Sequence, residues 1–131
     1  LPNAEQKPYK ITSESIEKND SSGKIIEFPL LTTTFLGKKI PAAGGFYLRS
    51  LPTKVIKNAF KNYQNKGMPA SFYIHSWELT PEFMPKLDLP FKDKFTTYHN
   101  LGKAYSRMKE LLKNFEFTSF ERFLTKYNFQ N

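Results

Sequence analysis

The sequence predicts an α/β fold in which short parallel strands accompany two long amphipathic helices. One observation is a stripe of apolar side chains at helical spacing in residues 52–66, followed by a glycine and a short apolar segment, residues 69–77. A helix that leads through a glycine into a buried strand is typical of a βαβ unit, whose strands lie parallel. A second helical stripe lies in residues 101–115, and an apolar segment at residues 25–30 supplies another strand.

The first quarter of the chain is expected to hold loops and short strands. Residues 1–24 are polar and rich in turn residues, which predicts mostly loop. Tyr9 and Ile11 are the apolar pair that could anchor this segment to the rest of the chain. Residues 25–30 predict a short buried strand, and residues 31–36 are rich in β-forming side chains.

Each of the two predicted helices has recognisable ends. The helix at 52–66 stops at Gly67, which favours the left-handed conformation that ends helices. The helix at 101–115 follows Asn100, a residue type that caps helix N-termini.

The remaining segments connect these elements. Residues 41–45 form a loop of small residues that allows close backbone approach, and residues 69–77 are the strand that follows the first helix. Residues 79–95 contain three prolines and are expected to form an extended surface loop. Residues 117–124 predict a short strand or a helical turn, and no element is assigned to residues 127–131.

Length and composition limit the possible functions. The 131 residues suit a single domain or a fragment, and 39% hydrophobic residues suffice for a packed core. No apolar run reaches the ~18–20 residues of a membrane-spanning helix. The lack of cysteine excludes disulfides and thiolate chemistry, and two histidines make a histidine-rich metal site improbable. The chain starts with leucine and shows no signal peptide, which indicates a processed product or an excerpt and favours a cytoplasmic location.

His75 is the first candidate functional residue because it closes the predicted strand at 69–77. Catalytic groups gather at the carboxyl ends of parallel strands, and an imidazole transfers protons near neutral pH. The alternative is a core histidine that hydrogen-bonds to the backbone. Trp77, the one tryptophan, could stack on a sugar ring or could pack at the edge of the core.

Further candidates lie near the predicted first strand and in the small-residue loop. Glu27 would face the site if the sheet is parallel, or would face solvent on an edge strand. Gly44 and Gly45 could let the backbone approach a ligand, to which Tyr47 and Arg49 would offer a hydroxyl and a cationic group. The phosphate-binding motifs G-x-G-x-x-G and G-x-x-x-x-G-K-[ST] are absent, and the residues alone favour a loop that leads into a helix.

The chain is basic, with 20 Lys and Arg against 12 Asp and Glu and a formal net charge of +8. The lysines are spread over the whole sequence and interrupted by acids, with the best cluster in residues 52–66. No helix-turn-helix, zinc-finger or RNP-type motif accompanies them. A solvated face explains the charge, so nucleic acid is not the expected partner.

Seven segments occur in an order that is similar to one known family. They are LPNAEQKPYKI (1–11), IIEFPLLTT (25–33), LGKKIP (36–41), AGGFYLRSLP (43–52), FYIHSWEL (72–79), YHNL (98–101) and LLKNFEF (111–117). The last six together resemble the C-terminal region of polysaccharide deacetylases of the NodB-homology type, in particular the subgroup found with exopolysaccharide-export and exosortase gene clusters. The first, LPNAEQKPYKI, is similar to the segment just upstream of that region. AGGFYLRSLP and FYIHSWEL carry most of the specificity.

The resemblance implies the C-terminal part of a distorted (β/α) barrel that removes acetyl groups from N-acetylated sugars of a polysaccharide. The family uses a divalent metal, usually zinc, held by an aspartate and an H-x-x-x-H pair. Neither motif is present, so the upstream catalytic half would supply the metal, no cofactor is bound by this chain alone, and the isolated chain is expected to be inactive. By the same match, His75 would be the general acid that protonates the leaving amine.

The resemblance also assigns the sugar site, with Phe46 as a departure because the subgroup carries a third glycine there. Trp77 and Glu78 would shape the site and Glu27 would line it. The loop at its rim would contain Gly44, Gly45, Tyr47 and Arg49. The first alternative is a non-catalytic carbohydrate-binding or structural module. A basic nucleic-acid-binding domain is the second and less favoured alternative.

Overall fold

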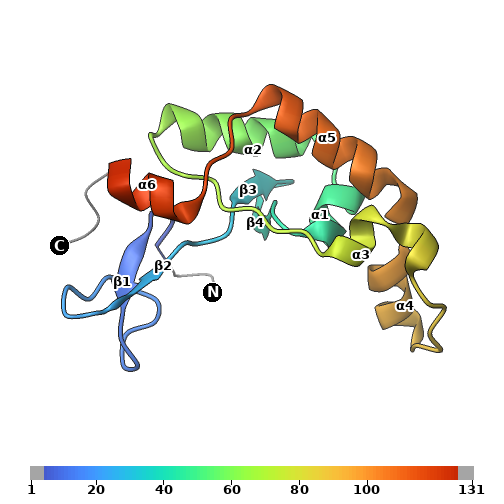
Figure 1. The fold of residues 1–131 in the computed structure, drawn as a ribbon, viewed down its shortest axis with the longest axis horizontal. Coiled ribbons are helices and arrows are strands. Elements are labelled where there is room, and N and C mark those ends of the chain that lie inside the picture. Colours follow the sequence, from blue (N-terminus) through green and yellow to red (C-terminus); the bar gives the residue numbers. More distant parts are fainter. Residues whose placement is uncertain (1–4, 127–131) are drawn as a thin grey trace.

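The computed structural model describes residues 5–126 and shows a mixed α/β chain (Figure 1). Two small sheets come first and helices make up the rest. The elements in order are β1 (Tyr9–Ile11), β2 (Ile25–Glu27), β3 (Thr32–Phe35), β4 (Lys38–Pro41), α1 (Gly45–Ser50), α2 (Thr53–Asn65), α3 (Ser76–Leu79), η1 (Pro81–Phe83), α4 (Phe91–Tyr98), η2 (Leu101–Lys103), α5 (Ala104–Asn114) and α6 (Phe120–Lys126).

The strands pair as two separate antiparallel sheets, so the predicted parallel arrangement is wrong for this part of the chain. β1 pairs with β2, with Lys10 opposite Ile26. β3 pairs with β4 across a tight turn at Leu36 and Gly37, both of which have positive φ. A two-residue connection can join only antiparallel strands, and positive φ at both positions suits the right-handed twist of a hairpin.

The predicted strand at residues 69–77 does not form. A single parallel bridge links Leu30 to Ser71, and the Leu31 amide donates to the Ser71 carbonyl at 3.0 Å. Beyond it the chain continues extended to His75 and then turns into α3. Glu78, three residues after the N-cap His75, accepts from the His75 amide at 3.1 Å, so local capping ends the extended segment.

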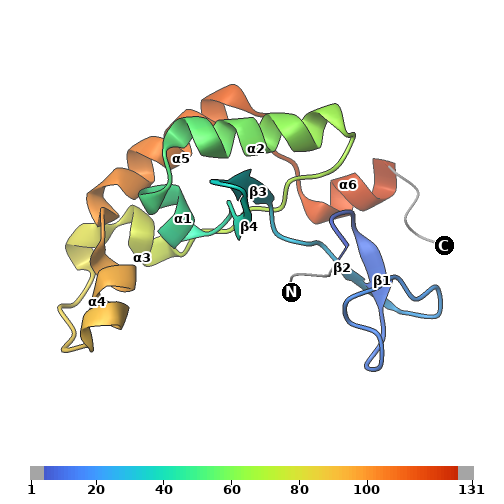
Figure 2. The ribbon, with the colours of Figure 1, turned by 180° about the vertical axis from the view of Figure 1, so that it is seen from behind.

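Both long helices are confirmed and form the main core. α2 and α5 lie side by side along one edge of the molecule (Figures 1 and 2), joined by an ion pair of 3.1 Å between Lys57 and Glu110. Phe60 stacks on Phe115 with ring centroids 4.8 Å apart. The side chains that are fully buried beneath these helices include Leu31, Leu48, Ile56 and Leu111.

Several local expectations are corrected. Asn100 does not cap a helix with its side chain, because its backbone is left-handed and a 3₁₀ turn, η2, precedes α5. The predicted loop at 79–95 contains η1 and most of α4, whose N-cap position is Pro90. Proline is tolerated at a helix start because the first amides there have no helical partner.

The two ends of the molecule are built differently (Figures 1 and 2). β1, β2 and α6 lie at one end, and α3 and α4 lie at the other.

The predicted loop at 1–24 contains β1, where Tyr9 is 2% exposed and donates its hydroxyl to the Ile16 carbonyl at 2.8 Å. Tyr9 therefore anchors this segment, as expected. Residues 1–4 and 127–131, which the sequence interpretation also covered, lie outside the described residues.

No helix within residues 5–126 has both the length and the apolar character needed to cross a membrane.

Candidate functional site

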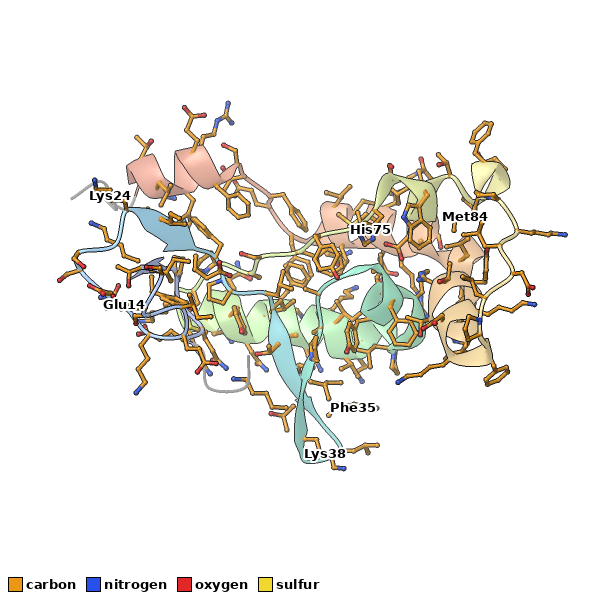
Figure 3. All side chains as sticks on the ribbon, turned by 90° about the horizontal axis from the view of Figure 1, so that it is seen from below. Glu14, Lys24, Phe35, Lys38, His75 and Met84 are labelled. Carbon is orange, nitrogen blue, oxygen red and sulfur yellow. The ribbon has the colours of Figure 1, made fainter. Side chains whose placement is uncertain are left out.

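His75 is the N-cap residue of α3, at the end of the extended segment that leads into this helix (Figure 3). The side chain is 55% exposed, and its Nδ1 atom lies 3.2 Å from Oε2 of Glu78. A carboxylate accepts hydrogen bonds, so Nδ1 can donate in this contact only when the neutral ring carries its proton on Nδ1 and none on Nε2. The result is an exposed imidazole that one carboxylate holds in a fixed orientation.

Glu78 divides its two carboxylate oxygens between two partners. Oε2 receives the His75 backbone amide and ring, whereas Oε1 lies 3.0 Å from Nε and 2.9 Å from Nη2 of Arg49. Glu78 and Arg49 are each only 1% exposed. A buried carboxylate is tolerated when its charge is paired and its oxygens are hydrogen-bonded, and Arg49 meets both needs.

Arg49 also binds the C-terminal end of α4. Its Nη2 donates to the Thr96 carbonyl at 3.1 Å, and its Nη1 donates to the carbonyl of His99. These carbonyls belong to the last turn of α4, where helices have unsatisfied acceptors. One guanidinium therefore connects α1, α3 and α4, and any contribution of Arg49 or Glu78 to a ligand site is indirect.

Gly44 and Gly45 permit this close packing. Gly44 has φ of 94°, and a β-carbon there would lie 2.9 Å from the Tyr73 ring. A β-carbon on Gly45 would overlap the carboxylate of Glu78. The close backbone approach expected from the two glycines is thus found, and the groups that approach are side chains of this chain.

Tyr73, His75 and Trp77 form an aromatic row. The Tyr73 ring meets the imidazole edge to face at a centroid distance of 5.5 Å. The Trp77 ring stacks on the imidazole at a centroid distance of 5.5 Å, with an interplanar angle of 16°. Sequence reasoning missed Tyr73, although alternate residues of an extended segment lie on the same side of it, which places Tyr73 on the side of His75.

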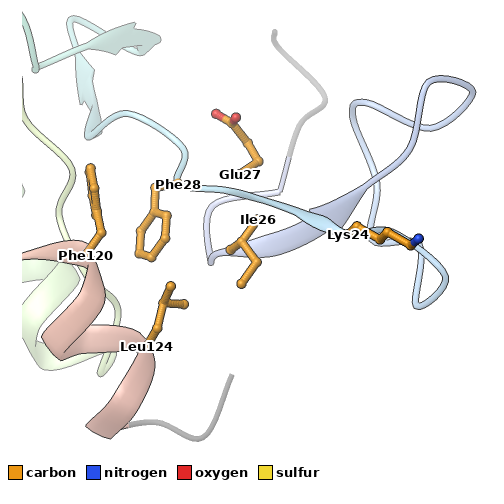
Figure 4. A pocket seen from close by; sticks show the side chains of 6 residues that line it. All are labelled: Lys24, Ile26, Glu27, Phe28, Phe120 and Leu124. Carbon is orange, nitrogen blue, oxygen red and sulfur yellow. The ribbon is translucent and has the colours of Figure 1, made fainter. Parts of the chain in front are cut away.

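Within residues 5–126, Tyr47 and Glu27 make no hydrogen bond, ion pair or ring contact with His75. Tyr47, on α1, is half-buried and meets Phe46 edge to face at 5.5 Å. Glu27, on β2, lies in the sheet at the far end of the molecule, so the structure does not bring it to His75. It borders an open pocket of about 510 Å³ that is lined by Lys24, Ile26, Glu27, Phe28, Phe120 and Leu124 (Figure 4).

The side chains of residues 5–126 do not fit a metal. Within that range no three His, Asp or Glu side chains come together as a group that could hold an ion. Glu78, the acid that contacts His75, offers no free oxygen to a metal, because one oxygen is bound by Arg49 and the other by His75. No step of a reaction is therefore assigned to a metal held by these residues.

The chain belongs to the DUF3473 family, a domain of unknown function, and the family model matches residues 1–125. The match includes Arg49, His75 and Glu78, so the cluster lies within the family's domain. No curated protein matches the chain, and no solved structure matches it.

Proposed function

We propose that this chain is the C-terminal part of a metal-dependent polysaccharide N-deacetylase, to which it contributes the general acid His75 and part of the sugar site. The observation that supports the proposal most directly is the contact between the imidazole of His75 and the carboxylate of Glu78. His75 is exposed, its Nδ1 contacts a carboxylate, and that carboxylate is anchored by a buried arginine. This is the arrangement that a proton-transferring histidine needs.

The chemistry follows from the orientation of the ring. When an acetamide is hydrolysed, the C–N bond breaks and the leaving nitrogen must gain a proton. His75 in its protonated form would donate that proton from Nε2, which faces away from Glu78. Glu78 stabilises the imidazolium before transfer, and general acid catalysis of this kind contributes roughly 10²–10⁴-fold to the rate.

The substrate would be an N-acetylhexosamine unit of an extracellular or capsular polysaccharide. Trp77 and Tyr73 each contact the imidazole and offer aromatic surface on which a pyranose ring could stack. Gly44, Gly45 and Arg49 would act behind this surface by holding Tyr73 and Glu78 in place. The role of Tyr47 at the rim of the sugar site remains a prediction. Glu27 lies at the far end of the molecule, so it would contact a different sugar unit of the polysaccharide from the one at His75.

The whole protein would carry a NodB-like distorted (β/α) barrel, with this chain as its last part. A divalent metal, zinc by expectation, would be held by the upstream half and would activate the attacking water. A cytoplasmic location also remains a prediction.

Acetate release tests the proposal. The product of the complete reading frame is incubated with N-acetylglucosamine oligomers, with and without a chelator, and the 131-residue chain is assayed in parallel. We expect acetate from the complete product, loss of that activity with chelator, and none from the 131-residue chain. Activity that survives chelation, or no acetate from any N-acetylated oligomer, would contradict it.

A non-catalytic carbohydrate-binding module is the second candidate, and the aromatic row favours it, with Tyr73 exposed and Trp77 half-buried. Such a module would bind N-acetylglucosamine oligomers as the 131-residue chain in the presence of chelator. The Trp77→Ala variant should then weaken binding about tenfold, or ~1.4 kcal/mol. Binding that is unchanged between low and moderate salt would also exclude a nucleic-acid-type interaction, whose affinity falls steeply with salt.

A further inference from the structure

We infer that Arg49 is a positioning residue for His75, acting through the carboxylate of Glu78. Its importance for catalysis rests on the proposed function, whereas the orientation itself can be tested in the isolated chain. Arg49 does not contact the imidazole. It contacts the one oxygen of Glu78 that His75 leaves free.

The division of the two carboxylate oxygens is the first step of the argument. Oε1 receives two N–H groups of Arg49, and Oε2 receives the His75 amide and ring. The two oxygens of a carboxylate are joined rigidly through one carbon, so holding Oε1 with two N–H groups restricts where Oε2 can lie. Without Arg49, Glu78 would be a buried charge with no cation beside it, and it would turn toward solvent or take up a proton. Either change removes the acceptor from Nδ1 of His75.

The second step concerns what fixes Arg49 itself. The guanidinium is held by the Thr96 and His99 carbonyls at the end of α4 as well as by Glu78. A planar group with donors in three directions can serve all of these acceptors at once, whereas a lysine ammonium is a single point of charge. We therefore expect Arg49→Lys to keep the positive charge beside Glu78 but to lose the fixed orientation of the Glu78 carboxylate.

Arg107 provides a matched control for a purely structural role. This second arginine reaches α1 from α5 and donates from Nη1 to the carbonyls of Leu48 and Leu51 at 2.7 and 2.9 Å. It thus stabilises the same short helix that carries Arg49. If loosening α1 were enough to disturb His75, Arg107→Met would have the same effect as Arg49→Met.

The experiment measures the tautomer of His75 by long-range ¹H–¹⁵N NMR of the 131-residue chain, at a pH where the ring is neutral. The chain has two histidines, so a His99→Gln variant assigns the signals. In the unsubstituted chain we expect the Nδ1–H form to dominate, whereas a neutral imidazole free in water favours Nε2–H. Arg49→Met and Arg49→Lys should each reduce the Nδ1–H form to the minor species, and Arg107→Met should leave it dominant.

Three results would overturn the inference: an unsubstituted chain that shows mainly Nε2–H, a folded Arg49 variant that keeps Nδ1–H, or an equal loss in Arg107→Met. Arg49→Lys retains the charge and most of the side-chain volume, so it serves if Arg49→Met does not fold. The measurement on the unsubstituted chain needs no variant at all. Failure of acetate release would count against the deacetylase proposal and would leave the tautomer result as it stands.

Discussion

The carboxylate of Glu78 occupies the space that a β-carbon on Gly45 would need. Gly45 is the first residue of α1, and Glu78 lies in α3, so the contact sets how closely the two helices approach. Arg49, one turn further along α1, then reaches the same carboxylate. The absence of a side chain at Gly45 is thus a condition for the ion pair that holds His75.

Gly45→Ala should destabilise the chain by about 1–3 kcal/mol, because the added methyl group forces the Glu78 carboxylate away from its partners. Urea unfolding followed by circular dichroism measures the free energy of unfolding. Gly102→Ala is the matched control, since a β-carbon there meets nothing within 4 Å. Equal stability of the two variants would mean that the carboxylate does not pack against Gly45.

Phe60→Ala should cost about 3–5 kcal/mol, the range for large-to-small changes at a buried aromatic. Phe60 is almost fully buried, and its ring contacts the rings of Phe72, Phe115 and Phe117. Phe91→Ala, at a residue that is 86% exposed, should change stability by no more than about 0.5 kcal/mol. Thermal or urea unfolding compares them, and similar losses in both would refute this description of the core.

Alkaline pH should weaken the anchor of the N-terminal segment. Burial, with a smaller contribution from the nearby Glu27, raises the pKa of the Tyr9 phenol above its ordinary value of 10.0. A group with a raised folded-state pKa contributes stability below its unfolded pKa, and that contribution is lost as pH rises through the folded pKa.

The Tyr9→Phe variant checks this expectation. It should lack the highest-pH step in the phenolate absorbance titration and show a smaller loss of stability above about pH 10. It should also lose about 1 kcal/mol at neutral pH, because the hydrogen bond to the Ile16 carbonyl is gone. A titration curve that keeps its highest-pH step in Tyr9→Phe would show that another tyrosine is responsible.

The two long helices could be predicted because their signal is local. In α2 the apolar side chains repeat at helical spacing, and the same positions, among them Ile56 and Phe60, are buried in the structure. Strand partners are not local. The partner of β2 is the three-residue strand β1 within a polar segment, and no periodicity in residues 25–30 indicates it.

The sequence predicts which residues belong to the candidate site better than it predicts what each of them does. His75 was identified as the proton-transferring group, and that role remains a prediction. Arg49 and Glu78 were expected near the sugar, and the structure places them in the interior as a buried pair. A sequence does not show whether a charged side chain meets a ligand or another side chain, because that depends on the packing of α1, α3 and α4.

The most direct test of the account is the turnover number of a His75→Ala variant in the product of the complete reading frame, measured together with its metal content. We expect kcat to fall roughly 10²–10⁴-fold with the metal content unchanged, as when a general acid is lost. His99→Ala is the control, because that imidazole contacts Phe95 and Asn100 and makes no contact with Glu78. An unchanged kcat in His75→Ala would contradict the assignment of His75 as general acid, and a loss of metal would make it a ligand instead.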